Sequence, residues 1–282
     1  MNTKALPSPH SRFHNAYTQG HFVNYALFKL LICCSLFTTY AQAQTFDGVR
    51  ISIKGGALYS GINDLQTPSL SEPYFLNHSL KGEKKIGYTG GLGVNWELKN
   101  SIAALSLDIL YAQQGSDLLF KNLEKDFNYK MQFNYRYLNF PLMIKVYPFE
   151  KVHDGLHGFN VGVGPQFGLN LSPENIIYTS DGPGKVPEFG SDLEQQQQLR
   201  NVLKGQNNFG LNFHLGYEIV NAGLNFDLKY HHGLTDVVRT EANPYNFIEN
   251  KNTNNTFQFT LGWEFLSSYP KKRVLIIRKP RS

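Results

Sequence analysis

Histidines and carboxylates are the residues of this sequence that could serve as metal ligands or acid–base groups. His153 and His157 lie four positions apart, but Gly155 separates them and no helix is indicated, so the spacing predicts a turn pair. The adjacent residues His231 and His232 would point to opposite faces of a strand and could not chelate one ion together. The sequence therefore predicts no metal site and no bound cofactor.

One histidine has a carboxylate within reach. His214 and Asp227 lie on the same face of two neighbouring expected strands and could form a hydrogen-bonded pair. We interpret this pair as a structural contact and not as an acid–base dyad. The motifs G-x-S-x-G and H-E-x-x-H and the P-loop are absent, and nothing arranges a serine, a histidine and an acid as a triad. We therefore expect a protein that has no catalytic residues and is not an enzyme.

Further charges share the polar side of stretches in which apolar residues occupy every second position. An isolated buried charge is very costly, so charges on an enclosed polar face must pair with opposite charges. The near balance of the two signs predicts a packed ionic network instead of an open, charge-selective pore. Together with His214, the predicted network comprises Arg50, Lys54, Glu97, Asp108, Lys145, Glu218, Asp227, Lys229 and Glu264.

The stretches that position these residues have the period of β-strands. Apolar and polar residues alternate with a period of two, which places them on opposite faces of a strand. Long and short connections also alternate, which is typical of an up-and-down barrel. We therefore predict an all-β, eight-stranded antiparallel barrel with long loops at one end (the loop end) and short turns and both termini at the other (the tight-turn end). The expected strands lie near residues 49–59, 86–98, 103–114, 137–148, 159–170, 209–219, 224–231 and 256–265.

Three features indicate which face of this barrel meets lipid. Glycine is frequent on the polar face, which suits a narrow interior, and the apolar face carries more bulk than an eight-stranded interior could hold. Aromatic residues mark both ends of the apolar face, as in the girdles at the two lipid–water interfaces. We expect a transmembrane β-barrel, with a secreted, soluble lipocalin-like ligand-binding barrel as the alternative. The girdle residues are Trp96, Tyr217, Trp263 and Phe265 at the tight-turn end and Tyr59, Tyr88, Tyr111 and Tyr230 at the loop end.

The stretch Tyr137–Pro148 shows the alternation most clearly. Its even-numbered apolar residues, from Leu138 to Val146, are expected to face lipid, and its odd-numbered residues, from Asn139 to Lys145, the interior. Pro141 has no N–H for the strand ladder, so it should lie at an irregularity.

Upstream of this stretch the alternation changes phase. Met131, Phe133 and Tyr135 are apolar at odd positions. One extra residue in a strand exchanges its faces, so we expect a β-bulge near Tyr137.

Charge and targeting signals divide the chain into three segments. Residues 1–43 resemble a secretory leader: an atypically long basic region precedes the apolar core Leu30–Phe37, and cleavage is expected after Ala43. Both cysteines lie in this leader. The expected barrel, residues 44–265, holds 18 bases against 22 acids, which does not favour nucleic-acid binding. The tail, residues 266–282, has six bases and no acid.

Four motifs resemble the PorT-like outer-membrane β-barrel family of Gram-negative bacteria. The segment Tyr137–Lys145 is similar to the family pattern Y-L-x-(aliphatic or aromatic)-P-L-x-x-K, and the segments Leu110–Ser116, Gly162–Pro165 and Tyr230–Asp236 agree with it. The resemblance implies an outer-membrane location, and the family's best-known member is implicated in assembling a protein-secretion system. The basic tail departs from the family pattern, in which the chain ends at the last strand.

These observations lead to a non-enzymatic expectation. We expect a monomeric outer-membrane protein, surrounded by outer-membrane lipid, with both termini in the periplasm. Its role would be structural or interactive, as an accessory to protein secretion or envelope assembly with a partner from that machinery. A narrow, porin-like channel is the alternative. The polar loops at 171–207 and 236–254 could bind a partner or form a solvated cap. The tail could bind anionic lipid, bind a periplasmic partner or remain a disordered extension.

Overall fold

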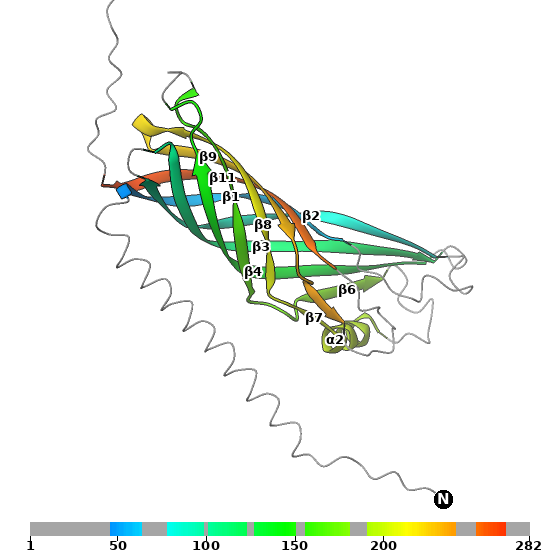
Figure 1. Cartoon of the computed structure of the whole chain (residues 1–282). Helices are drawn as coiled ribbons and strands as arrows, with labels where there is room; N and C mark the ends of the chain where they lie inside the picture. Colours follow the sequence, from blue (N-terminus) through cyan, green and yellow to red (C-terminus); the bar gives the residue numbers. More distant parts are fainter. Residues whose placement is uncertain are drawn as a thin grey trace, which may run out of the picture. The chain divides into compact units, whose positions relative to one another are not determined.

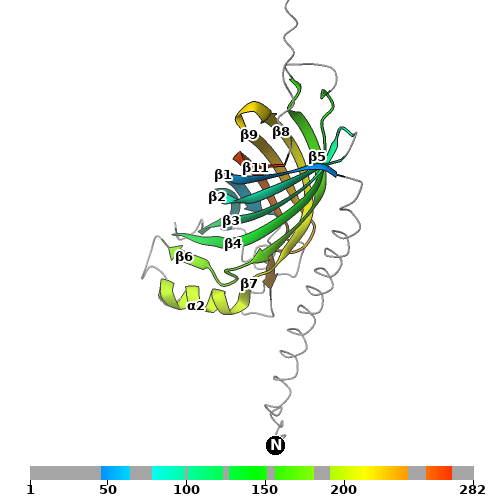
Figure 2. The same cartoon turned by 90° about the vertical axis from the view of Figure 1, so that its left-hand side faces the viewer.

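The computed structural model describes residues 46–63, 78–98, 101–122, 127–150, 156–180, 191–240 and 252–268. The expected leader and the tail from residue 269 onward lie outside the described residues. Within the described part, eight long strands lie around a ring in the order β3-β2-β1-β11-β9-β8-β5-β4, and pairing between β3 and β4 closes it (Figure 2). The predicted eight-stranded barrel is confirmed. Its strands are β1 (Phe46–Ile62), β2 (His78–Leu98), β3 (Ala103–Asn122), β4 (Phe127–Val146), β5 (Phe159–Asn170), β8 (Asn208–Ile219), β9 (Leu224–Gly233) and β11 (Asn254–Ser267).

The outer wall of the barrel is apolar and its interior is polar. On β8, burial alternates at every position, with Phe213 51% exposed on the outside and Asn212 1% exposed on the inside. The same alternation leaves Ile144 58% and Trp263 53% exposed. A lipocalin-like barrel would bury these side chains, so the outward apolar face supports the membrane-spanning arrangement. Among the described residues, no helix is long and apolar enough to cross a membrane.

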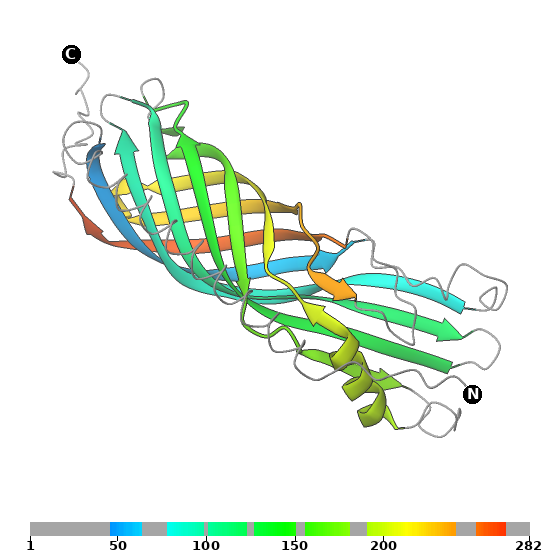
Figure 3. The same cartoon turned by 60° about the horizontal axis from the view of Figure 1, so that its bottom comes forward.

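The rim of the barrel at the loop end is uneven. Strands β2, β3 and β4 have 20 or 21 residues, whereas β5, β8 and β9 have 10 to 12. Strands β2, β3 and β4 therefore continue past their neighbours as a sheet (Figures 1 and 3). A short strand, β6 (Ile176–Ser180), pairs with β4 along residues 129–133 of this sheet. We call residues 78–85, 116–122 and 127–135 together with β6 the strand extension.

The strand extension corrects two expectations about loops. Residues 116–122 and 127–130 lie between the expected strands 103–114 and 137–148, where sequence alternation indicates a polar loop, but they form strands with an antiparallel register that runs to Asn122 and Phe127. The expected loop at 171–207 contains β6, the helix α2 (Asp192–Val202) and the strand β7 (Leu203–Gly205). These segments contribute buried apolar side chains such as Ile176, Leu199 and Leu203. Each segment is too short or too irregular for its sequence alternation to indicate a strand.

The expected bulge near Tyr137 is wrong. The β3–β4 and β4–β5 ladders keep one register throughout, so the faces of β4 do not exchange. Met131, Phe133 and Tyr135 point to the same side as Lys145, and all are buried. The interior itself changes from polar to apolar at this level. Pro141 lies where the β3–β4 pairing is interrupted opposite Asp108, without a register shift.

A hydrophobic core explains this change. Side chains from β3 and β4 meet others from β6, α2, β7 and β10 (Val238–Thr240), which pairs with β7. Apolar side chains therefore pack together in the interior at the loop end of the barrel. Its buried members are Ile62, Leu118, Met131, Phe133, Tyr135, Tyr137, Ile176, Leu199, Leu203, Val237 and Val238.

Helix α2 begins at a capping box. Ser191 accepts a hydrogen bond from the Glu194 backbone, and the Glu194 carboxylate accepts one from the Ser191 backbone N–H. That second bond, together with one from the Ser191 side chain, lowers the pKa of Glu194 below its usual value.

Helix α2 also covers the edge of β6. Gln196 accepts from the Tyr178 N–H at 3.2 Å, Asp192 accepts from the Ser180 N–H at 3.1 Å, and Arg200 donates to the Ile176 carbonyl at 2.9 Å. The three helical residues are four apart and therefore share one face. Their side chains occupy backbone groups to which another strand could otherwise add.

Replacing a lipid-facing residue by arginine tests the membrane-spanning arrangement. Leu228 is 47% exposed and lies between Leu215 and Phe259 on the neighbouring strands. We expect Leu228→Arg to lower the free energy of unfolding by about 2–4 kcal/mol, because a charge on this face must leave water for hydrocarbon. Urea titration of the protein folded in phospholipid vesicles measures the loss. Thr179→Arg, at an exposed position of the strand extension, is the control, and equal losses at both positions would contradict the assignment.

Candidate functional site

The candidate site is the polar interior of the barrel, which contains two groups of ion pairs. The first, the Arg50 cluster, joins four strands. Arg50 on β1 lies 2.9 Å from Glu97 on β2, 2.6 Å from Glu218 on β8 and 2.8 Å from Glu264 on β11. One guanidinium therefore binds three carboxylates, and its planar fork of donors suits this role.

Two neutral side chains complete the Arg50 cluster. Tyr147 donates its hydroxyl hydrogen to Glu218 at 2.7 Å and accepts from Arg50 at 3.2 Å. Asn95 donates to the same hydroxyl at 3.3 Å. Neither residue belonged to the predicted network, although Asn95 is on the polar face of β2 and Tyr147 occupies the next inward position after Lys145. Both lie two positions from a residue of the predicted network, Asn95 before Glu97 and Tyr147 after Lys145. Extending the strand alternation by one inward position would therefore have included both.

The second group, the lysine cluster, lies further toward the loop end. The Lys54 ammonium lies 3.0 Å from a carboxylate oxygen of Asp108 and 2.9 Å from one of Asp227. Lys229 binds Asp108 as well. All four residues are almost completely buried. Because each aspartate meets at least one lysine, the charges compensate one another where water is scarce.

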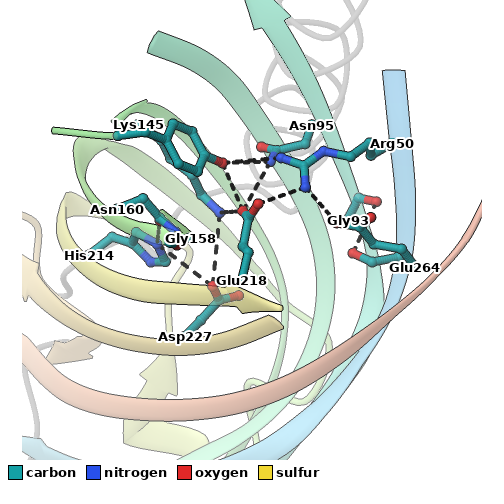
Figure 4. A network of polar contacts seen from close by, with 12 residues as sticks. Arg50, Gly93, Asn95, Lys145, Gly158, Asn160, His214, Glu218, Asp227 and Glu264 are labelled. Carbon is teal, nitrogen blue, oxygen red and sulfur yellow. Dashed lines mark hydrogen bonds and ion pairs between the residues drawn. The ribbon is translucent and has the colours of Figure 1, made fainter. Parts of the chain in front are cut away.

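Lys145 lies between the two clusters (Figure 4). Its ammonium is 4.0 Å from Glu218 of the Arg50 cluster and 3.9 Å from Asp227 of the lysine cluster. His214 is 3.7 Å from Asp227 but makes its hydrogen bond to Asn160 on β5 at 2.7 Å. The expected His214–Asp227 pair is therefore a near contact, and Asn160 is the histidine's hydrogen-bond partner.

The structure brings all ten residues of the predicted network into this interior. They come from β1, β2, β3, β4, β8, β9 and β11, and Asn160 adds β5. Every strand of the ring therefore contributes a side chain to the polar contacts. The sequence did not reveal which acid meets which base.

Interior glycines make room for these contacts. A Cβ atom on Gly93 would lie 2.5 Å from an Asp108 carboxylate oxygen and 2.7 Å from the Lys54 side chain. A Cβ atom on Gly216 would lie 2.6 Å from the His214 ring. On the lipid-facing side, by contrast, a Cβ atom on Gly55 would meet nothing within 4 Å. Glycine at the inward positions is therefore needed for space.

Neutral amides fill the lumen between the lysine cluster and the hydrophobic core. Asn254 donates to Gln114 at 2.5 Å, and Asn212 donates to Gln166 at 2.9 Å. His231 lies 3.0 Å from Asn212 and is buried, whereas His232 is exposed on the outer face. The two adjacent histidines thus point to opposite faces, as the strand alternation predicts.

In the described part of the chain, two cavities adjoin the ionic groups. A space of only about 10 Å³ lies between the clusters and is lined by Arg50, Lys54 and Lys145 among others. A larger cavity of about 300 Å³ lies at the tight-turn end, and Arg50, Tyr147 and Glu218 line it. The cavity among the clusters is therefore small, and the larger one lies on their tight-turn side.

Metal binding has no support from this part of the chain. Among the described residues, no three His, Cys, Asp or Glu side chains are grouped so that they could hold an ion. His153 lies outside the described residues, so its relation to His157 stays a prediction.

Removing the shared cation tests the importance of the Arg50 cluster. Arg50→Met keeps most of the side-chain length but leaves Glu97, Glu218 and Glu264 together without their guanidinium. We expect the free energy of unfolding to fall by about 3–5 kcal/mol, the usual loss when one partner of a buried ion pair is removed. Urea titration in phospholipid vesicles measures it.

A surface lysine provides the matched control for this substitution. Lys81 pairs with Glu83 at 2.9 Å, but its side chain is 74% exposed. Solvent screens such a pair, so Lys81→Met should be as stable as the unaltered protein. An Arg50→Met variant that also keeps its full stability would show that the cluster is dispensable.

Solved structures similar to this chain are outer-membrane proteins. OprG from Pseudomonas aeruginosa is 14% identical, with 79% of this chain and 98% of that chain covered and a TM-score of 0.41. Ail from Yersinia pestis, solved with the heparin analogue sucrose octasulfate, is 12% identical, with 77% and 99% covered and a TM-score of 0.31. At these values neither likeness identifies a function. No curated protein is similar enough to this chain to count as a match.

The family comparison is more informative. The family described as outer membrane protein beta-barrel domain matches residues 40–239, which is more than half of the chain. The match includes the strands that carry Arg50, Lys54, Asp108 and Lys145. With its closed ring, apolar outer wall and polar interior, this chain belongs to the outer membrane protein beta-barrel domain family.

Proposed function

We propose that this protein is a non-conducting outer-membrane barrel with a structural or interaction role, as an accessory to protein secretion or envelope assembly. The filled lumen is the observation that carries the proposal. The Arg50 cluster and the lysine cluster cross the interior from strand to strand, and the cavity found among their described side chains measures only about 10 Å³. A space of that size holds about one water molecule and gives no continuous path for ions.

The orientation in this proposal follows from the connections. We place the loop end outside the cell and the tight-turn end in the periplasm, because outer-membrane barrels have short periplasmic turns and longer external loops. The expected leader supports export through the inner membrane. The finer assignment to the PorT-like family, and with it the secretion role, rests on the motifs around Tyr137–Lys145.

The strand extension is the part best suited to meet a partner. Helix α2 covers the edge of β6 and the hydrophobic core packs against the extension, and preorganised elements present binding residues with little loss of entropy. On the face opposite the core, Lys130 lies 2.6 Å from Asp117, and Lys85 donates to Asn134 at 2.5 Å. We propose that this polar face, at the loop end, binds the partner.

A narrow channel is the second candidate, and the cavity at the tight-turn end is the observation that favours it. A hollow of about 300 Å³ already leads inward to Arg50. Conduction would then require the two ionic clusters to separate.

Conductance in planar lipid bilayers distinguishes the two candidates. We expect the purified protein to give no stable openings, because the paired charges leave no continuous water path through eight strands. A porin of known conductance, inserted under the same conditions, shows that insertion is detected. Reproducible openings of uniform size would reject the non-conducting barrel and support the channel.

Deletion of the gene in its own bacterium tests the accessory role. We expect a deletion strain to lose a subset of the secreted or outer-membrane proteins that the parent contains, as quantified by mass spectrometry of medium and membranes. The unaltered gene should restore them, while Lys130→Glu should not, because it reverses a charge on the proposed binding face. Lys204→Glu, an exposed charge reversal on β7, is the control. Unchanged protein profiles in the deletion strain would refute the accessory role.

A further inference from the structure

The cavity at the tight-turn end is lined by residues from several strands and connecting turns. Tyr147 and Arg50 lie at its inner side, and residues 101–103, 157–158 and 220–223 form walls. Ser267, at the end of β11, completes the lining. Its volume of about 300 Å³ is large enough for several side chains or a small molecule.

Among the described residues, most of the charged groups that line this cavity are acidic. The carboxylates of Glu97, Glu150, Glu218 and Glu264 line it together with the Arg50 guanidinium and the His157 ring. Glu218 is the most enclosed, with 4% of its side chain exposed, whereas Glu97 and Glu264 keep 19% and 12%. Glu97 and Glu264 therefore bind Arg50 and are also accessible from the cavity. The excess of carboxylates favours a positively charged occupant.

The chain leads from this cavity directly into its most basic segment. Ser267 lines the cavity, and residues 269–282 follow it with six bases and no acid. Lys271, Lys272 and Arg273 are the first of these bases. An extended chain advances by about 3.3–3.6 Å per residue, so Lys271, four residues after Ser267, lies within about 14 Å of this part of the lining.

We propose that the cavity binds the chain's own C-terminal segment, residues 269–282, through its lysine and arginine side chains. Opposite charges face one another across a tether of a few residues, and such a short tether gives a local concentration in the millimolar range. This inference does not depend on the proposed role in secretion.

Chemical labelling of a cavity residue tests the proposal on the full chain. Ser101 lines the cavity and is exposed, so Ser101→Cys places a thiol in the wall. The rate of maleimide labelling is measured in zwitterionic detergent micelles. It is compared between the unaltered tail and a tail in which all six bases are replaced by glutamine. We expect the basic tail to slow labelling by about tenfold, as when it occupies the cavity about nine-tenths of the time.

Controls separate occupation of the cavity from other effects. Thr179→Cys, on the strand extension, should be labelled at the same rate with either tail. The protein without an engineered thiol measures any labelling of Cys33 and Cys34. Heat-modifiable gel mobility verifies that each variant is folded. A second measurement needs no tail variant: high salt should speed labelling of Ser101→Cys in the chain with its own tail, because salt screens exposed charges.

Three results would overturn the proposal. Equal labelling rates with the basic and the neutral tail, together with no effect of salt, would show that the tail does not occupy the cavity. Protection that arises only after addition of anionic phospholipid vesicles would show that the tail binds lipid instead. Equal slowing at Ser101→Cys and Thr179→Cys would show a general effect on the protein.

Discussion

The contact between Arg50 and three carboxylates is the interaction on which the interior of this barrel depends. A lipid-facing wall must be apolar, so the polar side chains of all eight strands point into a narrow space. Charges enclosed there are tolerated only in pairs. Arg50 satisfies Glu97, Glu218 and Glu264 from three other strands, and Lys54 repeats the arrangement with Asp108 and Asp227. These pairs tie together strands that are far apart in the sequence.

The interior of the barrel uses different chemistry at its two ends. Ion pairs cross the interior next to the cavity at the tight-turn end, amides follow, and a hydrophobic core around Phe133 and Leu203 lies at the loop end. This gradient explains why β4 keeps one register although its inward side chains change from Lys145 to Tyr135. Lipid requires apolar side chains on the outer face of the barrel. The inward side chains do not contact lipid, so their polarity depends on the segment that packs against them.

The same division suggests how the protein could act without a pore. The ionic clusters lie between the strand extension at one end and the cavity lined by Glu97, Glu218 and Glu264 at the other. A partner at the strand extension and the basic tail in the cavity would occupy opposite ends of the barrel. Neither interaction requires the ionic clusters to move, so both are compatible with a lumen that stays closed.

The sequence by itself determined the strand count, the barrel and the lipid-facing side, because a period of two is a local property that each strand shows separately. It also marked the ten interior residues from Arg50 to Glu264. Only the tertiary structure decided their partners, since His214 meets Asn160 and Lys145 lies between Glu218 and Asp227. The absent bulge at Tyr137 and the helix over β6 were likewise decided by contacts between distant segments. Pairing, register and covering elements depend on how the ring closes, and no single strand contains that information.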